Sequence, residues 1–159
     1  MLDYATEYHL RRLIHRSTKL QDRGQVEELA QLFAQGEIVF GGAGQVFRGT
    51  QGVSALLKRN RFYDANGNPA DPNHVYATTR ALHYLSNVDI YEGDAGTLSA
   101  ESLFLIVQQV KESPRIVIGG RYLDTFGEAG GRYHFKRRIV EVHFVGDTDS
   151  YLPSHPWVP

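Results

Sequence analysis

The side chains in this chain best suited to chemistry are a histidine, His83, and a carboxylate, Asp22. A neutral imidazole in a partly buried strand can act as a general base near pH 7. A carboxylate that accepts the Nδ1 proton of such a histidine fixes its tautomer and leaves Nε2 free to take a proton. Taken singly, His83 is more commonly a core residue bonded to backbone, and Asp22 a solvated residue at a helix end. Together they predict an acid–base pair.

A third candidate, Arg138, comes directly after Arg137 in a basic segment. Neighbours in a strand face opposite sides, so the two arginines cannot both point inward. A buried arginine needs an anionic partner or a developing negative charge, because an uncompensated charge is costly in an apolar interior. The alternative is a solvated arginine that protects an edge strand from aggregation.

Other chemistries lack support in the sequence. The seven histidines are spread over different segments with no HxH or HExxH spacing, which argues against a metal site. The glycine-rich segment 41–49 lacks the Lys-Ser/Thr ending of a phosphate loop and the third glycine of a dinucleotide motif. Neither a G-x-S-x-G motif nor a cysteine is present. We therefore expect no metal and no cofactor.

Composition limits the class of partner. The 159 residues are 42% apolar and carry 17 Lys and Arg against 18 Asp and Glu, without a long block of one sign. This is one domain with a substantial core and no electrostatic footprint for nucleic acid or an anionic membrane. No apolar run approaches a membrane span, and residues 1–16 are too charged for a signal peptide. We expect a cytoplasmic protein that binds a small apolar molecule.

The elements that must position these residues begin with helices. Apolar residues recur at helical spacing from residue 4, and Gly24 comes just after the end of this first helix near Asp22. Two more helices are expected before residue 61, at residues 25–34 and 52–60, and two short strands lie between them, at residues 37–40 and 45–48.

From residue 77 onward the pattern changes to period two, which is typical of strands. One face of the first strand carries Thr79, Ala81, His83, Leu85, Asn87 and Asp89. Further strands are expected at residues 97–110, 115–126 and 132–145, joined by short turns. Helices followed by an antiparallel meander indicate an α+β domain in which helices cover one face of a curved sheet.

Two segments fall outside this pattern. Residues 62–73 are rich in Asn, Asp, Gly and Pro, which argues against a regular element there and favours either a lid or a mobile loop. Residues 147–159 are proline-rich and contain the single tryptophan, Trp157. This tail is either disordered or anchored by Trp157 across a neighbouring subunit or the sheet edge.

Three segments of the chain carry a family resemblance: residues 17–22, 83–87 and 119–138. They resemble the SnoaL-like branch of the nuclear-transport-factor-like cone fold, and within it scytalone dehydratase and lindane dehydrochlorinase. The resemblance implies a cone-shaped α+β barrel over residues 1–146, with three N-terminal helices on a strongly curved, mainly antiparallel sheet, followed by the tail at 147–159. Where relatives often carry tyrosine or lysine, five residues before the aspartate, this chain has Ser17.

The resemblance also implies a catalytic pair at His83 and Asp22, with an assisting arginine at Arg138 and oligomerisation through the sheet as a homodimer or homotrimer. On that basis Arg138 should face the interior and Arg137 should not. Candidate walls of the substrate cavity are Phe33, Phe40, Phe62, Tyr63, Leu103 and Tyr122.

The resulting hypothesis is a cofactor-independent lyase of the dehydratase type, or an isomerase, acting on a small apolar cyclic substrate. His83 would remove a proton from carbon, Asp22 would orient it, and Arg138 would balance charge at the leaving group or enolate oxygen. The alternative is a non-catalytic protein, either a ligand-binding module or an assembly subunit similar to the small β subunit of ring-hydroxylating dioxygenases. The assembly alternative predicts that the interior of the domain is filled and that an apolar face of the sheet is buried against another chain.

Overall fold

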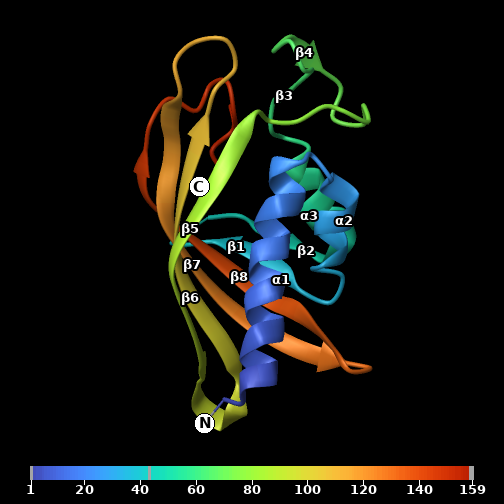
Figure 1. Ribbon diagram of the computed structural model, residues 1–159, viewed down its shortest axis with the longest axis vertical. Helices are drawn as coiled ribbons and strands as arrows, with labels where there is room; N and C mark the ends of the chain where they lie inside the picture. The colour runs from blue at the N-terminus through green and yellow to red at the C-terminus, as the bar shows by residue number, and fades with distance from the viewer. Residues whose placement is uncertain (1, 43, 158–159) are drawn as a thin grey trace.

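The chain folds into a curved six-stranded sheet with helices on one side (Figure 1). The computed structural model describes residues 2–42 and 44–157, so residue 43 of the expected glycine turn and residues 158–159 of the expected tail lie outside the described residues. Three α-helices are present in the described part: α1 (Tyr4–Asp22), α2 (Val26–Gln31) and α3 (Gly49–Leu57). None of these helices combines the length and apolar character needed to span a lipid bilayer.

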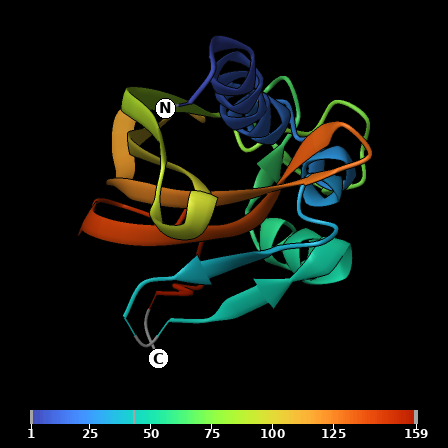
Figure 2. The ribbon, with the colours of Figure 1, turned by 90° about the horizontal axis from the view of Figure 1, so that it is seen from below.

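The sheet has the strand order β2-β1-β8-β7-β6-β5. Its strands are β1 (Glu37–Phe40), β2 (Val46–Arg48), β5 (Ala81–Glu92), β6 (Leu98–Gln108), β7 (Arg115–Ala129) and β8 (Arg132–Val145). All neighbours are antiparallel except β1 and β8, which run parallel. Figure 2 shows the sheet bending around the side on which the helices lie. The predicted α+β cone architecture is confirmed.

Helix α1 has a defined start and a defined end. At its start the Asp3 carboxylate accepts a hydrogen bond from the backbone N–H of Thr6, at 3.0 Å. At its end Gly24 adopts a positive φ of 69°, its N–H donates to the carbonyl of Gln21, and the N–H of Gln25 donates to that of Leu20. These two bonds form a Schellman motif. The motif fixes the last turn of the helix, which carries Asp22.

Strand β5 departs from simple alternation. The pairing with β6 slips between Ser86 and Asp89, and Asn87 has a φ of 50°. The extra residue of this bulge reverses the facing of the later residues of the strand, so Ile90 is buried while Asn87 and Asp89 are exposed. The prediction that Asn87 and Asp89 share the inner face with His83 is therefore wrong.

Residues 62–73 contain regular structure, contrary to the prediction. Phe62–Tyr63 (β3) pairs with Pro69–Ala70 (β4) in a small antiparallel hairpin. The Asp64 carboxylate closes it by accepting hydrogen bonds from the backbone N–H groups of Asn66 and Asn68, at 2.8 and 2.9 Å. The turn formers thus build a hairpin, and a role for it as a lid stays a prediction.

The described part of the C-terminal tail packs against its own chain. Tyr151, Leu152 and Pro156 are buried, and the indole of Trp157 stacks on His155 and contacts Phe40, with ring centroids 4.8 and 6.0 Å apart. Over residues 147–157 the tail is therefore ordered, and Trp157 anchors it within the domain.

A buried ion pair joins the last two strands. Asp124 of β7 and Arg138 of β8 are cross-strand neighbours, and the guanidinium donates from Nε and Nη2 to the two carboxylate oxygens, both at 2.8 Å. The Arg138 and Asp124 side chains are 6% and 1% exposed. Arg137 lies on the other face, half exposed, and pairs with Glu37. Arg138 thus faces the interior and Arg137 does not.

We predict that Gly24→Ala destabilises the protein by about 2 to 4 kcal/mol, because an added Cβ would lie 2.2 Å from the carbonyl oxygen of Ala77 at a positive φ. Gly131→Ala is the matched control, with a φ of 74° and nothing within 4 Å of the added Cβ, and should cost only about 1 kcal/mol. Urea denaturation measures both. Equal losses would contradict the steric argument.

We also predict that Arg138→Met lowers the free energy of unfolding by about 3 to 5 kcal/mol, because it leaves the Asp124 carboxylate buried without its partner. The neighbouring Arg137→Met removes an arginine from a solvated pair and should cost about 1 kcal/mol or less. The double variant Arg138→Met with Asp124→Leu should regain most of the stability that Arg138→Met loses, because replacing a whole buried ion pair by apolar residues is often nearly neutral. A similar cost for both single variants in urea denaturation would argue against the buried pair.

Candidate active site

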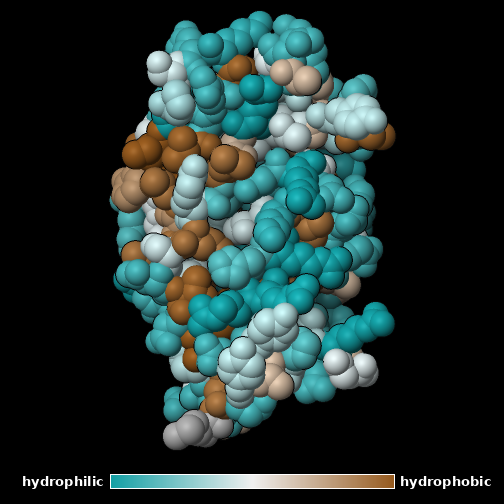
Figure 3. Space-filling model, viewed as in Figure 1, coloured by the Kyte–Doolittle hydropathy of each residue, from teal (hydrophilic) through white to brown (hydrophobic). Residues whose placement is uncertain are grey.

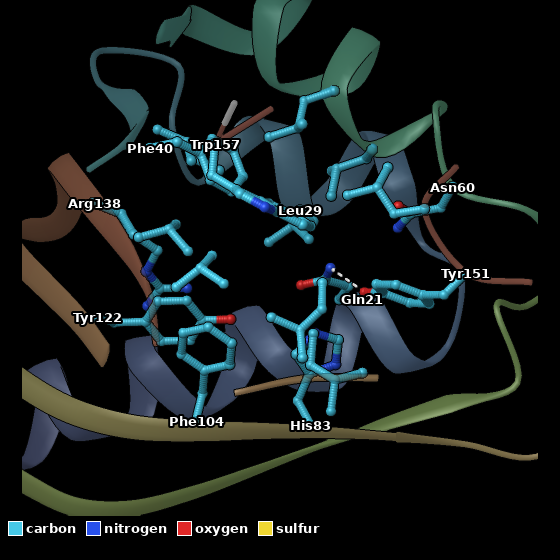
Figure 4. Close-up of a pocket in the computed structure, with 18 of the residues that line it drawn as sticks. Gln21, Leu29, Phe40, Asn60, His83, Phe104, Tyr122, Arg138, Tyr151 and Trp157 are labelled. Atoms are coloured by element: carbon cyan, nitrogen blue, oxygen red, sulfur yellow. Dashed lines mark hydrogen bonds between the residues drawn. The ribbon is translucent and has the colours of Figure 1, made fainter. Parts of the chain in front are cut away.

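An apolar cavity lies between the inner face of the sheet, the helices and the C-terminal tail (Figure 4). It offers about 80 Å³ to the centres of water molecules, several times the roughly 10–15 Å³ that one water requires. It is therefore large enough for a small organic molecule. Its lining includes Leu29, Leu56, Leu57, Phe104, Ile106, Ile118, Val140 and Leu152, with polar groups from Gln21, Asn60, His83, Tyr122, Arg138 and Tyr151.

His83 and Asp22 meet at this cavity. The His83 Nδ1 and Asp22 Oδ1 atoms are 2.6 Å apart, and the backbone N–H of His83 donates to the same oxygen at 3.1 Å. The His83 side chain is fully buried and that of Asp22 is 18% exposed. An ionised carboxylate can only accept, so Nδ1 carries the proton of a neutral imidazole and Nε2 carries the lone pair. Nε2 is buried and has no hydrogen-bond partner among the described residues.

Arg138 reaches the cavity with each of its three nitrogens already donating one hydrogen bond. Besides the two bonds to Asp124, Nη1 donates to the hydroxyl of Ser17 on α1 at 3.1 Å. Burial alone would favour the neutral guanidine, but the charge and hydrogen bonds of Asp124 outweigh it and hold the pKa of Arg138 above its ordinary value. Its charge is thus compensated within the protein, whereas the prediction from the sequence had it balance charge on a substrate.

The aromatic ring of Tyr122 is held between two other groups. It stacks on Phe104 with centroids 4.2 Å apart, and the guanidinium carbon of Arg138 lies 4.3 Å from its centroid. Burial raises the pKa of Tyr122 to about 12, although the nearby Arg138 acts in the opposite direction. The hydroxyl therefore stays protonated, and Figure 4 shows it projecting into the cavity.

The tail supplies a second tyrosine to the cavity. The Gln21 amide donates to the hydroxyl of Tyr151 at 3.2 Å, as the dashed line in Figure 4 shows. Burial raises the pKa of Tyr151 as well. Gln21 precedes Asp22 at the end of α1, so the tail is tied to the helix turn that carries the acid–base pair.

Three of the six predicted cavity walls line the cavity: Phe33, Phe40 and Tyr122. Leu103 does not, because β6 presents Phe104 and Ile106 to the inside and Leu103 to the opposite face. Phe62 and Tyr63 are buried in the small hairpin instead, where the Tyr63 hydroxyl donates to the carbonyl of Ser150 at 2.7 Å.

Four polar residues of the site were not predicted from the sequence: Asp124, Gln21, Asn60 and Tyr151. A charge pair across the hairpin could have suggested Asp124, because it lies almost as far before the Gly130-Gly131 turn as the arginines lie after it. No pattern pointed to Gln21, Asn60 or Tyr151. In the described part of the chain no three His, Asp or Glu side chains are grouped so that they could hold a metal ion.

Solved structures show the same fold. ActVI-ORFA from Streptomyces coelicolor is 12% identical with a TM-score of 0.69, over 87% of this chain and 98% of that one. A candidate scytalone dehydratase from Novosphingobium aromaticivorans is 20% identical with a TM-score of 0.68, over 90% and 87%. A candidate aromatic ring hydroxylase from the same organism is 14% identical with a TM-score of 0.70, over 94% and 99%. At these identities the likeness shows the fold alone.

Comparison with curated proteins finds no sequence relative. The family model of the SnoaL-like domain, however, matches residues 4–139. That match runs from the first helix into the last strand and includes Asp22, His83 and Arg138. It covers most of the chain, which therefore belongs to the SnoaL-like domain family.

Proposed function

We propose that this protein is a cofactor-independent lyase of the dehydratase type, or an isomerase, that acts on a small apolar cyclic molecule. One observation carries the proposal. The lone-pair nitrogen of His83 is buried at an apolar cavity with no partner among the described residues, while its other nitrogen lies 2.6 Å from Asp22. A core histidine would use both nitrogens in the protein, whereas this one keeps an acceptor for something else.

The proposed reaction needs no other base. Nε2 of His83 takes a proton from a substrate carbon, and the electrons of that C–H bond form a double bond. Asp22 accepts the Nδ1 proton in a hydrogen bond and stabilises the imidazolium. In a dehydration the C–O bond to the neighbouring hydroxyl breaks, and the imidazolium returns its proton to that oxygen, which leaves as water. In an isomerisation the proton returns to another carbon.

The cavity supports a single-ring substrate of limited polarity. Its size exceeds that of a few waters, and most of its lining is aliphatic or aromatic. Lys and Asp or Glu side chains are not part of the lining among the described residues. A highly charged substrate would therefore lose its hydration without gaining a free counter-charge, which favours a neutral ring.

An assembly role is the second candidate, because one surface observation favours it. Large apolar side chains are exposed near one end of the sheet: Leu82, Tyr84, Ile116, Phe144 and Val145. Figure 3 shows brown side chains gathered at the upper left, where the sheet lies. Such a patch is typical of contact surfaces. The open cavity, however, differs from the filled interior that a purely structural subunit would have. The homodimer or homotrimer stays a prediction.

We predict that His83→Ala and Asp22→Asn each lower kcat by about 10²- to 10⁴-fold, the usual contribution of a general base. The assay follows the ultraviolet absorbance of the conjugated enone formed from single-ring β-hydroxy ketones. Both variants should keep the far-ultraviolet circular dichroism of the wild-type protein.

His143→Ala is the matched control for this assay, since His143 lies on β8 with a side chain 47% exposed. It should leave the rate unchanged. Turnover that survives His83→Ala would rule out the proposed mechanism. Loss of turnover with His143→Ala would show that the assay reports folding and not the acid–base pair.

A further inference from the structure

We propose that the hydroxyl of Tyr122 donates a hydrogen bond to the substrate oxygen on which negative charge develops while His83 removes the proton. This inference rests on the proposed function and assigns to Tyr122 the role that the family resemblance predicts for Arg138. It also narrows the substrate class to rings that carry a carbonyl oxygen conjugated with the carbon that loses its proton. No proton leaves Tyr122 in this step: the proton moves from carbon to Nε2, and the electron pair is delocalised onto the oxygen.

Tyr122 and His83 face the same cavity from different strands. His83 of β5 is level with Ile106 of β6, and Tyr122 of β7 is level with Ser102 of β6. Four residues along a strand correspond to about 13 Å. The inward side chain between these two levels is Phe104, and Ile106 lies at the level of His83; both line the cavity. A flat ring lying on them would have the base at one end and the phenol at the other.

Arg138 is poorly suited to this role itself. Three of its nitrogens already donate, two to Asp124 and one to Ser17. A carboxylate held by two parallel hydrogen bonds neutralises most of the guanidinium charge as seen from the cavity. The guanidinium carbon, moreover, lies over the Tyr122 ring, 4.3 Å from its centroid. Arg138 and Asp124 are therefore positioning residues for Tyr122.

The orientation of the phenol is fixed before any ligand binds. Phe104 packs on the Tyr122 ring and Arg138 lies close to the same ring, so the direction of its C–O bond is set by packing. A donor held in place in an apolar site stabilises developing charge without reorganising during the reaction. The hydroxyl projects into the cavity (Figure 4). A phenol placed there can donate a hydrogen bond to a ligand oxygen or a water.

The raised pKa of Tyr122, about 12, is consistent with this role. The phenol remains a donor over the whole physiological pH range, and it cannot act as a competing base. Tyr151, the other cavity tyrosine, already accepts a hydrogen bond from Gln21 and lies at the tail side of the cavity. The two hydroxyl groups are thus not equivalent, and the one on Tyr122 is the one proposed to donate to the substrate.

The test uses 4-nitrophenol as a single-ring probe whose phenolate oxygen stands in for the developing oxyanion. It is titrated into the full-length protein at a pH where the free probe is half ionised, and its visible absorbance reports the ionisation of the bound form. In Tyr122→Phe, which keeps the ring and its packing, we expect the dissociation constant to rise about tenfold or more, as for loss of a hydrogen bond to a charged group. The bound probe should also shift from phenolate toward phenol.

Tyr91→Phe is the matched control, because Tyr91 of β5 is 44% exposed and is not among the described residues that line the cavity. It should change the affinity by less than about twofold, below the effect of one hydrogen bond to a charged group. A wild-type protein that does not bind the probe, a Tyr122→Phe variant with unchanged ionisation of the bound probe, or an equal loss in Tyr91→Phe would each overturn the inference. These outcomes leave the acid–base pair untouched, because its own test is turnover in His83→Ala. Conversely, probe binding that depends on Tyr122 would support its role as a hydrogen-bond donor even if the protein turned over no ketone.

Discussion

The ion pair between Arg138 and Asp124 is the interaction on which the interior of this molecule depends. Both side chains are almost fully buried among aromatic rings, and charges in such a place are tolerated only when they are paired and hydrogen-bonded. The pair also binds Ser17, so it ties two strands to the first helix. Because Arg138 and Asp124 compensate each other's charge, the other polar groups that line the cavity are neutral.

The same requirement explains the geometry of the acid–base pair. Asp22 ends a helix, where the helix dipole disfavours a negative charge. Its carboxylate is compensated by the backbone N–H and the Nδ1–H of His83. A Schellman motif at Gly24 fixes the turn that presents it. Asp22 thus links the end of α1 to β5, and its hydrogen bonds to His83 direct the second nitrogen of that imidazole toward the cavity.

Sequence reasoning located the elements because their periodicity is strong, but it could not see the bulges that decide which side chains face inward. In β8, simple alternation from the buried Phe135 would turn Arg137 inward. A slip in the pairing with β7 places Lys136 and Arg137 both outside and Arg138 inside. The family resemblance named the correct arginine where alternation would not. The prediction that Leu103 lines the cavity was wrong for a related reason, since an error of one residue exchanges the two faces of a strand. The tail has no periodicity, and its packing depends on tertiary contacts alone.

In the proposed mechanism, the arrangement of polar groups leaves the choice between elimination and isomerisation to the substrate. Among the polar side chains that line the cavity in the described part of the chain, His83 is the one that can both take and return a proton near neutrality. A ring with a hydroxyl next to the carbanionic carbon offers it an oxygen to protonate, and water is lost. A ring without one offers only carbon, and the double bond moves. In this proposal one dyad and one fixed phenol serve both reactions, because the proton acceptor and the hydrogen-bond donor are the same in each.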